Sequence, residues 1–305
     1  MLKELIKTHF DIEIIDYQQV KKIDTLVFKV VDTEGSAFVA KLYKEHNKSI
    51  VEKIAQNAPF LAFVKTHTTL NVQLPPKLYF PLVKWKKENR YLVLGNWIEG
   101  ETPKIKDAHF MQQMGAMMAQ LHNAATAFTS KIDVLTIDNV LVQRVQGLIL
   151  AKQHFFEFDK KRLENAFKYI DSVYKRVGED PSVFGLIHTD LHFDNVIITP
   201  QNAVSPIDFD EVAYGHYLLD IAITFNEIED LEDESLKEDY CIGYKKYRPL
   251  PNYFDTYILD FQRIAGCIYL SWFLDEGNTD LPLNKKLLDY ARRSLEKILS
   301  CKVRP

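Results

Sequence analysis

The chain has 305 residues, of which 47% are apolar and 26% charged, a composition typical of a folded globular protein large enough for two subdomains. Its formal net charge of −4 does not favour binding to nucleic acid or to a membrane surface. Three scattered cysteines without a CxxC pair argue against a disulfide framework or a cysteine zinc site.

The N-terminal residues mix charged and apolar side chains and lack the apolar run of a signal peptide. No apolar run approaches the ~18 residues that a membrane-spanning helix needs. We therefore expect a cytoplasmic protein with neither nucleic acid nor membrane as a partner.

The first hundred residues mostly show strand patterns. A short amphipathic helix is predicted at residues 2–9, and a second helix at 45–58, which Pro59 is expected to break or restart. Strand patterns rich in Val, Phe and Leu occur in four segments, residues 25–31, 36–44, 74–80 and 90–98. The sequence thus predicts a small antiparallel sheet with one inserted helix.

The pattern becomes helical after Gly100. Helices are predicted at residues 107–125, at 141–178 and throughout the chain after Asp220. Two short apolar strands, residues 182–187 and 195–199, interrupt this helical part. The boundary between the two parts lies near residues 94–100.

The octet HTDLHFDN, residues 188–195, places His188, Asp190, His192 and Asp194 at alternate positions. On a strand, alternate side chains share one face, so these four could form the metal cage of a hydrolase. The octet lies between two predicted strands, however, and is expected to be a loop, where alternation gives no common face. The metal cage is therefore the less favoured of two interpretations.

The other interpretation is a phosphoryl-transfer loop of the form H-x-D-x-x-x-x-N, which His188, Asp190 and Asn195 fill. A second metal-binding Asp should follow on the next hairpin. The segment SPIDFDE supplies Asp208, 13 residues after Asn195, a separation that suits a strand, a turn and a returning strand. The two motifs together are far more specific than an isolated HxD.

Lys41 lies in the middle of the apolar strand FVAKLY. A lysine in such a strand is costly unless it is paired, so we expect a phosphate or a carboxylate as its partner. The alternative is a solubilising lysine on an edge strand.

Taken together, these motifs resemble the aminoglycoside phosphotransferase and choline-kinase-like family, small-molecule relatives of protein kinases. The resemblance also covers LGNWIEG (94–100), MGAMMAQLH (114–122) and PIDFDEVAYGHYLLDIA (206–222). It implies an α+β, two-lobed protein-kinase-like fold with an N-lobe at residues 1–97 and a C-lobe at 98–305. ATP and Mg²⁺ are the implied cofactors.

The resemblance also implies roles for individual residues. Asp190 would be the catalytic base, and Asn195 and Asp208 would bind Mg²⁺. Nucleotide binding would fall to Lys41, which contacts the α- and β-phosphates, and to the backbone of a hinge that holds adenine, formed by Asn96, Trp97 and Ile98. Asp220 would brace the catalytic loop, with a helix N-cap as the alternative.

Three features depart from the pattern of protein kinases. The loop expected to cover the phosphates, residues 20–27, contains no glycine. The glutamate that pairs with Lys41 is assigned to Glu52, with Glu45 as the alternative. The metal motif reads D-F-D, so Asp210 could assist metal or substrate, or could instead have a solvated or capping role.

The expected partner is a small molecule with a hydroxyl group, and two features favour a cationic one. Residues 227–239 carry eight acids and one lysine, although a solvated helix or loop face is the favoured explanation of them. Tyr269, Trp272 and Asp275 could hold an ammonium group, although Trp272 could instead pack in the core. The alternative functions are a stress-response-type Ser/Thr protein kinase and a nucleotide-binding pseudokinase regulator.

Overall fold

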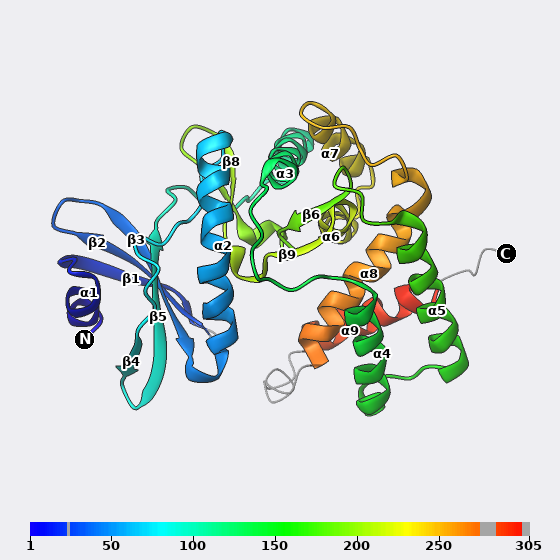
Figure 1. Cartoon of the computed structure of the whole chain (residues 1–305), viewed down its shortest axis with the longest axis horizontal. Coiled ribbons are helices and arrows are strands. Elements are labelled where there is room, and N and C mark those ends of the chain that lie inside the picture. The colour runs from blue at the N-terminus through cyan, green and yellow to red at the C-terminus, as the bar shows by residue number, and fades with distance from the viewer. Residues whose placement is uncertain (23–24, 275–284, 301–305) are drawn as a thin grey trace. The chain divides into compact units, whose positions relative to one another are not determined.

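A computed structural model describes residues 1–22, 25–274 and 285–300 of the chain (Figure 1). The chain folds into two compact units that interleave along the sequence. The first comprises Met1–Lys106, Asn123–Val134 and Phe193–Val212, and the second comprises Asp107–His122, Leu135–His192 and Ala213–Pro305. The predicted α+β class is confirmed. The lobe boundary between residues 97 and 98 stays a prediction.

The first unit is built on a five-stranded antiparallel sheet with the strand order β1-β2-β3-β5-β4. Its strands are β1 (Ile14–Lys22), β2 (Leu26–Asp32), β3 (Ala37–Lys44), β4 (Leu82–Trp85) and β5 (Glu88–Asn96). The sequence did not predict β1, whose polar residues are compatible with its position at the sheet edge. The strand predicted at residues 74–80 is wrong, because its two prolines lack N–H donors and the segment runs as a coil before β4.

Alternating residues of β3 face opposite sides of this sheet, which lie under different helices (Figure 1). Ala40 and Leu42 pack in one core with α1 (Leu2–Phe10). Tyr43 packs on the other side against Val51 of α2 (Lys48–His67), and Lys41 shares that side. The sheet therefore holds Lys41 on the face covered by α2.

Helix α2 continues through Pro59, so the expected break is wrong. A proline in a helix interior costs ~3 kcal/mol, because it removes one backbone hydrogen bond and its ring crowds the preceding turn. Phe60, Leu61 and Val64 are all buried after the proline. Their packing continues the apolar face of α2 and outweighs the local cost.

A short hairpin completes the first unit. It consists of β7 (Val196–Ile198) and β8 (Val204–Pro206), between the single turns η3 (Phe193–Asn195) and η4 (Phe209–Glu211). Glu101 pairs with Ile198 of this hairpin. A side chain at Gly100 would come within 2.2 Å of the Ile198 carbonyl oxygen, so only glycine permits this approach.

The second unit is mainly helical and contains the two-stranded sheet of β6 (Phe184–Ile187) and β9 (Ala213–His216). Helix α3 (Ala108–Ala127) begins in this unit, and α8 (Phe254–Leu274) contacts four other helices of the unit. The remaining helices are α4 (Asn139–Ala151), α5 (Lys160–Val177), α6 (Tyr217–Glu229), α7 (Ser235–Lys245) and α9 (Lys285–Leu299).

Residues 141–178, predicted to be helical, form two helices separated by a short irregular segment. The turn η2 (Gln153–Phe155) follows α4, and the Asp159 side chain caps the start of α5 by accepting a hydrogen bond from the Arg162 N–H at 2.7 Å. None of the described helices combines the length and the apolar character needed to cross a membrane.

Candidate active site

Lys41 lies on the inner strand β3 of the first unit, and its side chain is only 12% exposed. Its Nζ lies 2.5 Å from Oδ1 of Asp208 and 3.1 Å from Oδ1 of Asp210. Burial alone would lower the pKa of Lys41, but the two carboxylates outweigh burial and raise this pKa well above its ordinary value. The interpretation of Lys41 as a solubilising edge lysine is therefore wrong: β3 is an inner strand and the lysine is paired.

Asp208 and Asp210 flank Phe209 in the turn that follows the β7–β8 hairpin. Asp208 has a φ of 66°, a left-handed conformation that is uncommon outside glycine. Phe209 is buried, and its carbonyl oxygen accepts a hydrogen bond from the Asn57 side chain of α2 at 2.9 Å. The buried phenylalanine and this hydrogen bond hold the two carboxylates in place.

The pKa values of the two carboxylates shift in opposite directions. Burial would raise the pKa of Asp208, but the charge of Lys41 outweighs it and holds this pKa well below its ordinary value. Burial and the neighbouring Asp208 charge raise the pKa of Asp210 above its ordinary value despite Lys41. The Asp208 carboxylate is thus ionised at neutral pH and can offer oxygen ligands to a metal ion.

Asn195 lies near Asp208 because the hairpin folds back on itself. The Ile207 N–H donates to the Asn195 carbonyl oxygen at 2.9 Å, and Val196 pairs with Pro206. The predicted strand, turn and returning strand between Asn195 and Asp208 is therefore confirmed. An amide and a carboxylate offer the oxygen ligands that Mg²⁺ prefers, usually completed by phosphate and water. The donor set of this hairpin fits Mg²⁺.

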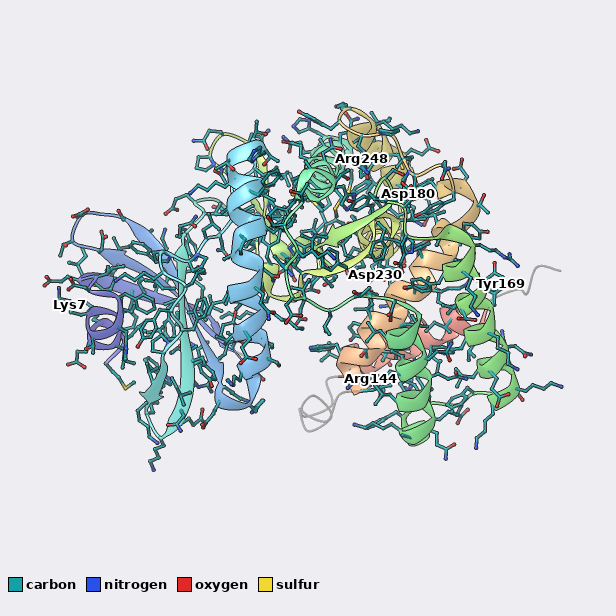
Figure 2. All side chains as sticks on the ribbon, viewed as in Figure 1. Lys7, Arg144, Tyr169, Asp180, Asp230 and Arg248 are labelled. Atoms are coloured by element: carbon teal, nitrogen blue, oxygen red, sulfur yellow. The ribbon has the colours of Figure 1, made fainter. Side chains whose placement is uncertain are left out.

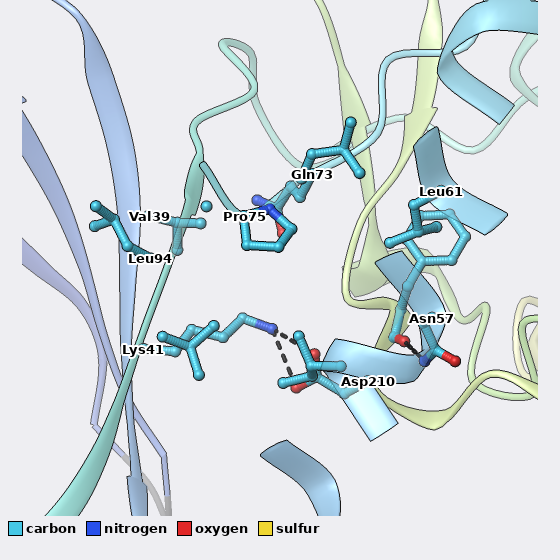
Figure 3. A pocket seen from close by; sticks show the side chains of 13 residues that line it. Val39, Lys41, Asn57, Leu61, Gln73, Pro75, Leu94 and Asp210 are labelled. Atoms are coloured by element: carbon cyan, nitrogen blue, oxygen red, sulfur yellow. Dashed lines mark hydrogen bonds and ion pairs between the residues drawn. The ribbon is translucent and has the colours of Figure 1, made fainter. Parts of the chain in front are cut away.

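A small apolar cavity of ≈ 50 Å³ lies beside Lys41 in the first unit (Figure 3). Val39 and Gly95 line it from neighbouring strands, Leu61 lines it from α2, and Asp210 lies at its edge. Gly95 pairs with Val39 across the sheet, and without a side chain it leaves the space beside Val39 open.

The predicted hinge begins at Asn96, the last residue of β5. The Asn96 N–H donates to the Leu74 carbonyl oxygen and the Trp97 N–H to the Ala37 carbonyl oxygen, both at 3.0 Å. Ile98 is buried, and within the residues that the structure describes its N–H has no hydrogen-bond partner. Of the three hinge N–H groups, that of Ile98 is the donor left for a ligand.

The structure places Glu52 away from Lys41. It precedes the cavity-lining Ile54 by two residues, about 200° around the helix, and pairs with Lys48 at 3.1 Å. Glu45 is exposed and accepts a hydrogen bond from the Asn89 side chain. Neither Glu52 nor Glu45 is therefore the carboxylate partner of Lys41. Its partners are the two aspartates of the D-F-D motif, which the sequence did not indicate as such.

The octet forms a loop in the second unit up to His192, as expected. Asp220 is 1% exposed, and its carboxylate accepts hydrogen bonds from the backbone N–H groups of His188 and Thr189, both at 2.8 Å. Its role as a brace is thus confirmed, and the N-cap of α6 is His216 instead. The Asp190 side chain is 52% exposed, with an oxygen 3.8 Å from Nε2 of His192.

The metal-cage interpretation of the octet gains no support. Among the described residues, no three His, Cys, Asp or Glu side chains gather closely enough to hold a metal ion. The His188 N–H and Thr189 N–H are directed at Asp220, and Thr189 has a φ of 68°, so the backbone does not alternate as a strand does.

Residues 16–253 match the model of the phosphotransferase enzyme family. The chain belongs to this family. The predicted resemblance is confirmed, and with it the predicted enzyme class, a phosphotransferase. Homoserine kinase of Neisseria meningitidis serogroup B is 29% identical over 185 residues, a match that spans 58% of this phosphotransferase and 58% of that relative.

Several solved structures share the fold. The amicoumacin kinase hAmiN, in complex with AMP-PNP, Ca²⁺ and Ami, is 16% identical with a TM-score of 0.73, over 93% of this phosphotransferase and 88% of that chain. A microcompartment-associated aminopropanol kinase is 18% identical with a TM-score of 0.68, over 98% and 95%. Choline kinase LicA from Streptococcus pneumoniae is 16% identical with a TM-score of 0.66, over 98% of both chains. The predicted kinase-like fold is confirmed.

Proposed function

We propose that this phosphotransferase is an ATP- and Mg²⁺-dependent kinase that transfers the γ-phosphate to a hydroxyl group of a small molecule. The observation that carries the proposal is the ion pair between Lys41 and Asp208, in which Nζ and Oδ1 are 2.5 Å apart. Asp208 and Asn195 follow and precede the same hairpin, β7–β8. A lysine that binds phosphate and a pair of oxygen donors for Mg²⁺ are what phosphoryl transfer from ATP requires.

Each residue has one task in the proposed reaction. Lys41 binds the α- and β-phosphates, and the Ile98 N–H donates to adenine. Asn195 and Asp208 hold Mg²⁺, which when bound neutralises phosphate charge. Asp190, five residues before Asn195, orients the acceptor hydroxyl and accepts its proton.

A small amino alcohol or hydroxy amino acid is the acceptor that we favour. The homoserine kinase relative supports this class, because its name specifies a hydroxylated amino acid. A cationic group on the acceptor stays part of the proposal. The described residues give it limited support, since Glu229 of the acidic segment already pairs with Lys237 at 3.0 Å and with Lys297 at 2.5 Å.

Other side chains considered for a cationic acceptor give mixed support. Asp230, labelled in Figure 2, pairs with Arg293 of α9 at 2.7 Å, so this acid of the segment already has a cationic partner within the chain. Trp272 is 46% exposed, which does not fit core packing of this ring. Asp275 lies outside the described residues.

An ATP-consumption screen tests the proposal. The acceptors are homoserine, ethanolamine, aminopropanol, choline, aminoglycosides, sugars and a generic protein, each with Mg²⁺ and with EDTA. We expect Mg²⁺-dependent ADP release and a phosphate ester with one of the small molecules. Phosphate on the protein acceptor alone would favour the stress-response-type protein kinase. Nucleotide binding without transfer to any acceptor would favour the pseudokinase regulator.

A further inference from the structure

Lys41 has two carboxylate partners, and under the proposed function only one of them, Asp208, also binds Mg²⁺. Asp208 contacts Lys41 through Oδ1 and is also the proposed ligand of Mg²⁺, so a bound metal draws on the same carboxylate. Asp210 offers both oxygens to Lys41, with Nζ 3.1 Å from Oδ1 and 3.2 Å from Oδ2 (Figure 3). Asp210 is therefore the partner that Lys41 can keep when a metal binds.

Helix α2 supplies no acid for this purpose. Its cavity-lining residues are Ile54, Asn57 and Leu61, which are all uncharged. The single acid in its sequence is Glu52, on the opposite side of the helix and paired with Lys48. A lysine on this face of the sheet must therefore find its lasting counter-charge outside α2.

Tyr43 fixes the position of Asp210 from the same strand that carries Lys41. It follows Lys41 by two residues, so both side chains lie on one face of β3. Tyr43 is 2% exposed, packs with Val51 and Val93, and donates a hydrogen bond from its hydroxyl to the Asp210 carboxylate. That carboxylate is thus held between a buried tyrosine and the lysine.

We propose that Asp210, held by Tyr43, is the positioning residue for Lys41, in the place that an acidic side chain of α2 would otherwise take. The inference rests on the proposed function, because positioning matters only if Lys41 binds phosphate. Asp210 keeps the ammonium group directed at the phosphate site while Asp208 serves the metal. Asp210 does not itself touch nucleotide or metal.

The rival assignment is Asp210 as a second metal ligand, and nucleotide titrations separate the two. We compare Asp210→Asn, which keeps the shape of the side chain and removes its charge, with Tyr43→Phe, which removes only the hydroxyl. In Asp210→Asn we expect kcat/KM for ATP to fall by between about 2-fold and 150-fold, the range of coupling between residues in contact. Tyr43→Phe should give a smaller loss in the same direction.

Two further measurements identify the route of the effect. The loss in Asp210→Asn should persist at saturating Mg²⁺, because added metal cannot replace the counter-charge of Lys41. In a double-mutant cycle, Asp210→Asn should add little once Lys41→Met is present. Glu211→Gln is the matched control: it removes an adjacent acid, which pairs with Lys53 at 2.6 Å, and should behave like the wild type.

Thermal unfolding of each variant separates misfolding from loss of positioning, and Tyr43→Phe carries the test if Asp210→Asn does not fold. The inference is overturned if Asp210→Asn or Tyr43→Phe matches an active wild type, if high Mg²⁺ restores the loss, or if the loss adds fully to that of Lys41→Met. A wild type that binds no nucleotide overturns the proposed function, and this inference with it.

Discussion

The carboxylate of Asp220 lies 2.8 Å from the backbone nitrogen of Thr189, a residue held at a φ of 68°. A β-branched side chain in the left-handed region is unfavourable, so the neighbouring structure must hold it there. Asp220 does so from inside α6, where it also accepts the N–H of His188 and lies 3.3 Å from Nε2 of the buried His122.

Replacing Asp220 by Ala should therefore destabilise the second unit. Two buried backbone N–H groups would lose their acceptor at a cost of ~1–3 kcal/mol each, so we expect a loss of about 2–6 kcal/mol. Urea unfolding measures it. Asp180→Ala is the control, because Asp180 (Figure 2) accepts the Ser182 N–H at the same 2.8 Å in an exposed turn, where water can replace it. Equal losses for the two variants would contradict the bracing role.

A second prediction concerns the contact of α3 with α7. A Cβ at Gly243 would lie 1.9 Å from the Gln112 carbonyl oxygen, and one at Gly115 would lie 2.0 Å from that of Tyr240. Gly243→Ala must push the helices apart. We therefore expect the free energy of unfolding, measured in urea, to fall by ~1–3 kcal/mol. Gly147→Ala, in α4 with open space around the added Cβ, should instead stabilise by ~0.5–1 kcal/mol. A stable Gly243→Ala variant would show that this close approach is not needed.

The parts of the site that are local in sequence were predictable. The loop that carries Asp190 and the hairpin from Asn195 to Asp208 follow from short apolar strands with polar residues at fixed spacing. The pairing of β2 with β3, the strand that carries Lys41, follows from two apolar runs and a turn that ends in glycine.

The contacts between distant segments were not predictable. Tyr43 and Asp210 are in contact although 167 residues separate them in the sequence, and no local sequence pattern predicts such a contact. The shared face of Tyr43 and Lys41, two residues apart on a strand, was the signal available. Glu52 was misplaced because Pro59 hid a continuous helix, and helix register decides which residues face the sheet.

The pH dependence of stability should depend partly on His216, which is 1% exposed and lies 3.2 Å from the Tyr253 hydroxyl. Burial lowers the pKa of His216 to about 4, whereas the ordinary value of histidine is ~6.5. The unfolded chain therefore binds a proton that the folded chain does not between these values. The stability contribution is complete above pH 6.5 and is lost as the pH falls toward 4, by about 3 kcal/mol.

Urea unfolding of His216→Gln between pH 4 and 7 checks this prediction. As the pH falls over this interval, the unfolding free energy of the variant should decrease less steeply than that of the wild type. The difference in slope should be at most that of one bound proton, ~1.4 kcal/mol per pH unit. His46→Gln, a histidine exchange at an exposed position, controls for the substitution itself. Parallel curves for wild type and His216→Gln would place the acid sensitivity at other groups.

Replacing Asp190 and replacing Asp208 should impair the proposed reaction in different ways. Asp190→Ala should lower turnover by ~10²–10⁴-fold, the usual loss for a general base, while Mg²⁺–ADP still binds. Asp208→Ala should abolish the Mg²⁺-dependent part of nucleotide binding, because Lys41 keeps Asp210 but the metal loses its carboxylate. Calorimetric titration of each variant with ADP, with and without Mg²⁺, distinguishes them. Asp194→Asn, an exposed acid of the same octet, should match the wild type in both assays, and loss of nucleotide binding in Asp190→Ala would contradict the assigned base.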